Sequence, residues 1–169
     1  DDVLRKKIDD LNTISFSICT GYARESYISR QISPLLDPGG DFLRKLNYFL
    51  IGDPLGHTFD EMEKIDAALP DKVFFSDKLL FNKKVRRFNP IVHSKIYIGY
   101  DDEESPIWAL VGSNNMTNNA MLGRNEESLI SIENESVLED IHAHIEDIRR
   151  KCKSLTSLNL GGLEIDTYE

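Results

Sequence analysis

The spacing of hydrophobic residues along the chain changes between a helical period and a strand period, and it predicts helices and strands in turn. Helical spacing predicts helices over 2–12, 23–36, 58–69 and 137–151. Alternating or continuous apolar runs predict strands over 13–20, 46–51, 73–75, 79–81, 91–99, 108–115 and 129–132. Strands that alternate with helices in this way predict an α/β sandwich with a mixed or largely parallel sheet.

The strand predicted over 91–99 carries two polar side chains next to each other. Its period of two places His93, Lys95 and Tyr97 on one face and apolar residues such as Ile96 and Ile98 on the other. A cation beside a neutral imidazole is unfavourable in a core, because an unpaired buried charge costs several kcal/mol. The pair is therefore better suited to facing an anion.

The strand predicted over 108–115 ends in small side chains that suit an anion site. Ser113 and Asn115 offer hydroxyl and amide donors to phosphoryl oxygens, and Gly112 allows a ligand to approach the backbone closely. Thr117 is placed to cap a predicted helix over 118–122, whose N-terminal amides would also favour an anion. This strand end is therefore predicted to open into a site.

Two carboxylates follow a turn at Gly123. Glu126 and Glu127 directly precede the strand predicted over 129–132. A carboxylate at this position could orient an imidazole and set its tautomer. The residues from His93 to Ile132 thus contain more candidate catalytic and anion-binding side chains than any other part of the chain.

Three motifs within these residues resemble the signature of the phospholipase D superfamily. They are His93-x-Lys95, Gly112-Ser113-x-Asn115 and Asn125-x-Glu127. A His-x-Lys pair is common by itself, but the full set within about 35 residues is far more specific. The chain looks most like the single-motif, metal-independent nucleases of that superfamily, which include a group of restriction enzymes. The resemblance implies an α-β-α sandwich, in agreement with the hydrophobic pattern.

The resemblance also implies a role for each residue of the set. His93 would be the nucleophile that forms a phosphohistidine, Lys95 and Asn115 would bind the phosphoryl oxygens, and Ser113 would assist. The glutamate would hold the nucleophilic histidine. The histidine of a second copy would serve as the general acid, and because this chain has one copy of the motifs, a twofold homodimer is expected. The resemblance implies no cofactor and no metal ion.

The chain departs from the superfamily pattern at two positions. The aspartate expected five residues after the lysine is replaced by Tyr100, with Asp101 one place later. That aspartate is commonly structural, so the catalytic set is retained. The second departure concerns the carboxylate: strict family spacing selects Glu126, whereas the Asn-x-Glu pattern and the apolar strand after it select Glu127. We predict that Glu127 is the active-site carboxylate.

Size and composition predict one domain. A chain of 169 residues with 40% hydrophobic content is long enough for a sizeable core, and we assign 1–154 to a phospholipase D-like nuclease domain. Residues 155–169 are either a final strand or the start of a linker to a further domain. The first residue is Asp1, which leaves open whether the chain is a fragment of a larger protein.

Charge is distributed unevenly. The net charge of −9 argues against a surface built uniformly for DNA, because phosphate neutralisation dominates nucleic-acid affinity. A run without acidic residues nevertheless leads into the His-x-Lys motif, and its cations are Lys78, Lys83, Lys84, Arg86, Arg87 and Lys95. This run is either an ordinary solvated loop or a means of steering phosphate to the site, and its place beside His93 favours steering.

The remaining candidate ligands have simpler explanations. Cys19 and Cys152 lack metal-ligand spacing and are expected to be buried, reduced thiols, which predicts a cytoplasmic protein. His142 and His144 lie two apart on a predicted helix and so on different faces, which is poor geometry for a shared metal. His57 lies in a turn and is expected to be a surface or capping residue. No apolar run approaches the roughly 18 residues of a membrane span.

The leading functional prediction is a DNA endonuclease domain, the cleavage module of a restriction or defence system. Its DNA specificity would come from a DNA-recognition domain or a helicase-like subunit. A phospholipase D-type lipid phosphodiesterase is the second possibility, disfavoured because such enzymes usually carry two motif copies in one longer chain. A catalytically idle dimerisation or nucleic-acid-binding module is the third. The sequence does not distinguish DNA from RNA or give the cleavage position.

Overall fold

The computed structural model describes residues 2–35, 37–52, 59–76, 93–117 and 127–157. The helices are α1 (Asp2–Asp9), α2 (Glu25–Gln31), α3 (Asp41–Lys45), α4 (Phe59–Ala68) and α6 (Glu135–Arg150), with a final 3-10 turn, η3 (Leu155–Ser157). The strands are β1 (Ser15–Thr20), β2 (Leu46–Ile51), β3 (Val73–Ser76), β4 (Ile96–Tyr100), β5 (Pro106–Gly112), β6 (Leu129–Ile132) and β7 (Cys152–Lys153).

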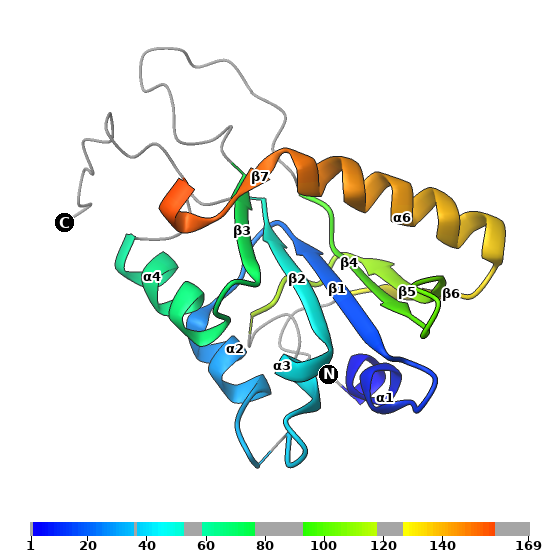
Figure 1. Cartoon of the computed structure of the whole chain (residues 1–169), viewed down its shortest axis with the longest axis horizontal. Helices are drawn as coiled ribbons and strands as arrows, with labels where there is room; N and C mark the ends of the chain where they lie inside the picture. Colours follow the sequence, from blue (N-terminus) through cyan, green and yellow to red (C-terminus); the bar gives the residue numbers. More distant parts are fainter. Residues whose placement is uncertain (1, 36, 53–58, 77–92, 118–126, 158–169) are drawn as a thin grey trace.

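These strands form one mixed sheet in the order β6-β5-β4-β1-β2-β3-β7 (Figure 1). Within it, β1 pairs with β2 and β2 with β3 in parallel. The pairs β1–β4, β4–β5, β5–β6 and β3–β7 are antiparallel. The expected mixed α/β fold is confirmed, but the expectation of a largely parallel sheet is wrong for the described strands, because parallel pairing is confined to β1, β2 and β3 and the other pairs are antiparallel.

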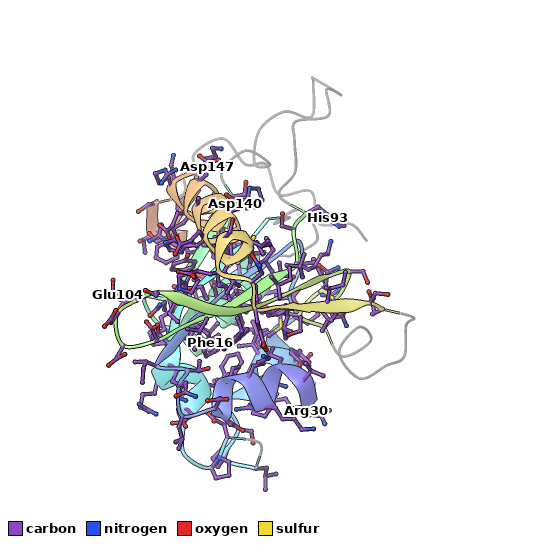
Figure 2. The ribbon with its side chains drawn as sticks, turned by 90° about the vertical axis from the view of Figure 1, so that its right-hand side faces the viewer. Phe16, Arg30, His93, Glu104, Asp140 and Asp147 are labelled. Atoms are coloured by element: carbon purple, nitrogen blue, oxygen red, sulfur yellow. The ribbon has the colours of Figure 1, made fainter. Side chains whose placement is uncertain are left out.

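Helices cover both faces of the sheet, so the sandwich has three layers (Figures 1 and 2). One core lies between the sheet and α1 to α4, with Ile8, Tyr27 and Ile65 packed near Phe16 and Phe49. The second core lies under α6, where Leu138, Ile145 and Ile148 pack with strand residues of the opposite face. The alternation of β4 follows from these two cores, because Tyr97 belongs to the first and Ile96, Ile98 and Tyr100 belong to the second.

Several boundaries differ from the sequence expectations. The strand predicted over 91–99 begins at Ile96, so His93 and Lys95 precede it. The segment after residue 154 begins with η3, whose Leu155 is buried, and the final strand or linker expected over 155–169 stays a prediction because 158–169 lie outside the described residues. The first residue of the helix predicted over 58–69, the strand predicted over 79–81 and the helix predicted over 118–122 lie outside the described residues. Among the described residues, no helix is long and apolar enough to cross a membrane.

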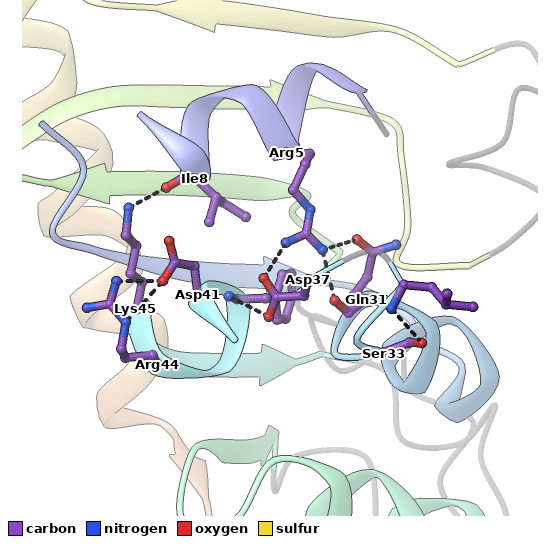
Figure 3. Close-up of polar contacts among 10 residues, drawn as sticks. Arg5, Ile8, Gln31, Ser33, Asp37, Asp41, Arg44 and Lys45 are labelled. Atoms are coloured by element: carbon purple, nitrogen blue, oxygen red, sulfur yellow. Dashed lines mark hydrogen bonds and ion pairs between the residues drawn. The ribbon is translucent and has the colours of Figure 1, made fainter. Parts of the chain in front are cut away.

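The helical face below β1 is held together by a buried ion pair (Figure 3). Arg5 of α1 donates to Asp37 Oδ1 at 3.0 Å, and the other Asp37 oxygen accepts the backbone N–H of Phe42 at 3.0 Å. The second guanidinium nitrogen of Arg5 donates to the Gln31 carbonyl at 2.8 Å. The Arg5–Asp37 pair thus connects α1 with the end of α2, through Arg5, and with the start of α3, through Asp37.

Replacing Asp37 with asparagine is expected to lower the free energy of unfolding by about 2 kcal/mol, because Asp37 is 5% exposed and Arg5 would lose its charged partner. Urea unfolding of the two proteins measures the difference. Asp41→Asn is the matched control, since the Asp41–Arg44 pair is solvent-exposed and its loss should change stability little. Equal unfolding midpoints for Asp37→Asn and the wild type would contradict this assignment.

Candidate active site

Four strand ends meet at one edge of the sheet and bring the candidate residues together. Because β4 runs antiparallel to both β1 and β5, its start lies beside the ends of those two strands. The start of β6 joins them, because Leu129 pairs with Gly112 at the end of β5. Figure 2 shows His93 at this end of the molecule and Glu104, in the β4–β5 turn, at the other.

His93 and Lys95 lie directly before β4 and contact each other. The Lys95 Nζ is 2.7 Å from His93 Nδ1 and 2.9 Å from Nε2, and it donates to the His93 carbonyl at 2.7 Å. The His93 side chain is exposed, whereas Lys95 is only 5% exposed. The ammonium therefore lies beneath an accessible imidazole, and the adjacency expected for the two side chains is present.

Burial changes the acid–base behaviour of Lys95. Desolvation lowers the pKa of the Lys95 ammonium below its ordinary value, while the negative charge of Glu127 raises it and so offsets part of the effect. The Cys19 thiol nearby is more deeply buried, and desolvation raises its pKa to about 12. Cys19 therefore stays a neutral thiol at physiological pH, and both Cys19 and Cys152 are buried, without a disulfide to another described residue.

Asn115 reaches the same point from the end of β5. Its Oδ1 accepts the backbone N–H of Tyr22 at 3.0 Å and lies 3.2 Å from the Thr20 hydroxyl. A parallel bridge between Ala23 and Met116 fixes this arrangement, with Arg24 N–H donating to the Met116 carbonyl at 3.0 Å. The segment after β1 and the segment after β5 thus enclose the start of β4.

Gly21 is the point at which these groups converge. A methyl group placed on Gly21 would lie 2.8 Å from His93 Cδ2, 3.4 Å from His93 Nε2 and 3.4 Å from Asn115 Oδ1. The His93 imidazole and the Asn115 carboxamide therefore both lie against the backbone of Gly21. Sequence reasoning missed Thr20, Gly21 and Tyr22, and the available signal was a glycine directly after a predicted strand.

Ser113 and Glu127 occupy the β5–β6 side of the site. The Ser113 hydroxyl donates to the Glu127 carboxylate, and the Ser128 N–H donates to Ser113 Oγ at 3.1 Å. The negative charge of the Glu127 carboxylate raises the pKa of Lys95. Its hydrogen bond with Ser113 holds it beside the segment after β5 that carries Asn115. The expected contact between this glutamate and a histidine remains a prediction, and Glu126 lies outside the described residues.

The close approach at Gly112 is made by protein backbone. A methyl group on Gly112 would lie 1.8 Å from the Ser128 carbonyl oxygen. Gly112 is thus required by the pairing of β5 with β6, whereas the sequence suggested that it admits a ligand. The same contact keeps Ser113 next to Glu127.

Other candidates lie away from the site. Tyr100, at the position of the family's aspartate, ends β4 and contacts His142 Nδ1 of α6 at 3.2 Å. This replacement is therefore separated from His93 and Lys95 by the length of the strand. His57 and the basic residues from Lys78 to Arg87 lie outside the described residues. Within the described part of the chain, no group of three or more His, Cys, Asp or Glu residues is placed to hold a metal ion.

If catalysis requires protonated Lys95, activity should fall at high pH as this ammonium deprotonates, below the ordinary lysine pKa because burial lowers it. Glu127→Gln removes the charge that raises the pKa of Lys95, so the alkaline limb of kcat/KM should move to lower pH. Rate profiles from pH 6 to 11 measure the shift. Asp102→Asn, in an exposed turn, is the control that should leave the limb in place. A limb that stays fixed or moves to higher pH in Glu127→Gln would contradict the assignment.

Comparisons with known proteins support one family. A family model described as the NgoFVII restriction endonuclease N-terminal PLD domain matches residues 58–159, more than half of the chain. No match was found among curated protein sequences.

Two solved structures share the fold. NucT from Helicobacter pylori is 18% identical with a TM-score of 0.62, over 91% of this chain and 89% of that one. Nuc from Salmonella typhimurium, a phospholipase D family member, is 17% identical with a TM-score of 0.58, over 90% of this chain and 88% of that one. The expected superfamily, fold and enzyme class, a phosphodiesterase or endonuclease, are thereby confirmed. The chain belongs to the family of the NgoFVII restriction endonuclease N-terminal PLD domain, within the phospholipase D superfamily.

Proposed function

We propose that the chain is a metal-independent DNA endonuclease that cleaves phosphodiester bonds through a covalent phosphohistidine on His93. The observation that carries this proposal is the convergence of an accessible imidazole, a buried ammonium and a fixed carboxamide at one edge of the sheet. Lys95 Nζ lies 2.7 Å and 2.9 Å from the ring nitrogens of His93. His93 and Asn115 both lie against Gly21.

In the first step, an unprotonated ring nitrogen of His93 attacks phosphorus and forms a P–N bond. The bond from phosphorus to the leaving oxygen breaks, and a general acid protonates that oxygen. In the second step, water attacks phosphorus and the P–N bond breaks. The proton of the water passes to the group that acted as the acid, so both catalytic groups return to their starting states.

Lys95 and Asn115 stabilise the charge on the non-bridging oxygens in both steps. A cation and an amide donor held in a partly desolvated site are effective because they need little reorganisation as charge develops. The burial of Lys95 supports this role. Ser113 and Glu127 assist by completing the polar wall of the site beside the β5–β6 pair.

The general acid is the His93 of a second copy, related by a twofold axis in a homodimer. The chain has a single His-x-Lys motif, and the exposure of His93 makes it accessible to another molecule. Light scattering should give twice the mass of one chain. Substitutions that prevent dimerisation should abolish cleavage, and an active monomer would overturn this part of the proposal.

The module would act in a restriction or defence system. The matched family is named for a domain of a restriction endonuclease. The net charge of −9 supports a division of labour, in which a DNA-recognition domain or a helicase-like subunit supplies most of the DNA affinity. The cleavage module would then contribute the chemistry and little sequence specificity.

Cleavage of plasmid and single-stranded DNA in excess EDTA tests the proposal. Cleavage that persists in EDTA and yields an acid-labile phosphoprotein intermediate is the expected result. Cleavage that stops in EDTA and returns with a divalent cation would overturn the mechanism. A preference for phosphatidylcholine vesicles would instead indicate a lipid phosphodiesterase, and binding of DNA without any turnover would indicate an idle module.

A further inference from the structure

The segment that leaves β1, residues 20–22, contacts both proposed catalytic side chains although it lies outside the motifs. Thr20 is the last residue of β1 and is fully buried, and its carbonyl accepts the Gly52 N–H at 2.9 Å. Tyr22 is held through its carbonyl, which accepts the Met116 N–H at 3.2 Å. Gly21 is therefore positioned from both sides by backbone hydrogen bonds of its neighbours.

This segment determines which way the Asn115 carboxamide faces. The Tyr22 N–H can only donate, and it lies 3.0 Å from one end of the carboxamide, so that end must be the oxygen. The Thr20 hydroxyl lies 3.2 Å from the same oxygen and 2.9 Å from the Tyr22 carbonyl, so its single proton is shared between these two acceptors and links Asn115 to the segment after β1. With Oδ1 facing these two groups, the NH₂ end points away from β1, which is the orientation that a donor to a phosphoryl oxygen needs.

Gly21 determines where the His93 imidazole can lie. The 2.8 Å separation between a methyl group at this position and His93 Cδ2 is shorter than real Cβ contacts allow. His93 is an exposed side chain, so its ring can rotate away at little cost to the fold. An added methyl group would therefore move the imidazole while leaving the core unchanged.

We propose that Thr20, Gly21 and Tyr22 form a positioning element of the active site. Thr20 and the Tyr22 N–H direct the Asn115 NH₂ toward the phosphate, and Gly21 leaves space for the His93 ring in its attacking position. These are positioning residues, since they act through Asn115 and His93. The proposal rests on the proposed function, because it assigns these two side chains their catalytic roles.

Hydrolysis of bis(p-nitrophenyl) phosphate by the full chain and its variants tests the proposal. Gly21→Ala should lower kcat about 100-fold with an unchanged unfolding midpoint, because displacements of about 1 Å have effects of that size. Thr20→Val should lower kcat about tenfold with KM changed less than about twofold, since oriented donors act on the transition state. Thr20→Ser, which keeps the hydroxyl, should restore most of the rate.

Gly39→Ala is the matched control, because the nearest atom to its added methyl group, Asp41 Oδ1, is 3.7 Å away. Wild-type rates in Gly21→Ala and Thr20→Val would overturn the positioning element while leaving the proposed function intact. A His93→Ala variant that still hydrolyses the diester would instead overturn the proposed function.

Binding of orthovanadate, a phosphoryl transition-state mimic, gives a readout independent of turnover. Calorimetry should show binding by the wild type, at least tenfold weaker binding by Asn115→Ala and Gly21→Ala, and wild-type binding by Gly39→Ala. Equal binding by wild type and Gly21→Ala would overturn the positioning role even if the probe diester is not hydrolysed. A Gly21→Ala unfolding midpoint lowered by more than a few degrees would also contradict the proposal, because an exposed ring that rotates away does not strain the core.

Discussion

Replacing His93 with alanine should reduce DNA cleavage by at least about 10⁴-fold without changing the fold. The imidazole is the proposed site of the covalent bond, and removing a nucleophile that acts with its partners as one unit typically costs three to six orders of magnitude. His93 is exposed and lies outside the strand that follows it. Its truncation therefore removes no core contact.

The comparison should be made in excess EDTA with plasmid DNA and at equal concentrations of folded protein. His144→Ala is the matched control, because His144 is also an exposed histidine. It belongs to α6, which packs on the face of the sheet opposite α1 to α4, and not to the strand ends that form the candidate site. Circular dichroism and unfolding midpoints should be the same for all three proteins. Cleavage by His93→Ala within tenfold of the wild type would exclude a phosphohistidine at this position.

A second consequence tests whether each active site needs two copies of His93. In a homodimer each site would use two copies of His93, one for each role. Mixed dimers of wild type and His93→Ala should therefore be inactive, and activity in a titration of one with the other should fall as the square of the wild-type fraction. A linear fall would mean that each chain carries a complete site.

The order of helices and strands was predictable because the pattern of apolar residues records which faces meet a core. The alternation at Tyr97 and Ile98 follows directly from the two cores on either side of β4. The short helix α3 was missed because its five residues are too few to show a helical period and the residues directly before it, 38–40, are Pro-Gly-Gly. It is held by the long-range contact of Asp37 with Arg5 and by the Asp37 bond to Phe42, neither of which a local pattern contains.

The strand boundary at Ile96 has a similar explanation. Alternation of apolar and polar residues continues upstream of Ile96 in the sequence, and the Lys95 carbonyl still accepts the Gly112 N–H at 3.2 Å, but the regular strand pairing of β4 begins at Ile96. Residues that serve a site at a strand end need not have strand geometry. Periodicity alone therefore placed the start of this strand too early.

The candidate site was predictable where its residues lie close together in sequence, as His93, Lys95 and Asn115 do. Thr20 and Gly21 lie more than seventy residues earlier, and only the antiparallel pairing of β1 with β4 brings them to His93. Pairing between distant strands depends on tertiary packing, so no local signal identifies the contact. The role of Gly112 was misjudged for the same reason, since its neighbour is Ser128 of the next strand segment.

Gly112→Ala is therefore expected to be severely damaging both to stability and to activity. The added methyl group would lie 1.8 Å from the Ser128 carbonyl oxygen and 3.0 Å from Leu129 Cα. Backbone atoms cannot rotate away as a side chain can, so the cost should exceed the roughly 1–3 kcal/mol of ordinary overpacking. Relief requires β5 and β6 to separate at the Gly112–Leu129 pair.

That separation would also disrupt the site. Ser113 N–H donates to the Ser128 carbonyl at 3.0 Å, so moving Ser128 pulls Ser113 away from Glu127 and loosens the segment that carries Asn115. We expect activity to fall about 10³-fold at a temperature where the variant is still folded, in line with the sensitivity of catalysis to small displacements. Unfolding by urea and cleavage in EDTA, measured on the same preparations, give the two effects.

Two other glycines make this prediction specific. Gly99→Ala should also destabilise the fold, because its methyl group would lie 2.2 Å from the buried ring of Trp108, but Gly99 lies toward the far end of β4 from His93. The folded fraction of the Gly99→Ala variant should therefore keep most of the cleavage activity. Gly39→Ala should affect neither property. If Gly112→Ala retained wild-type activity and stability, β6 could not pair with β5 in the register found here, and Glu127 would lose its place beside Ser113.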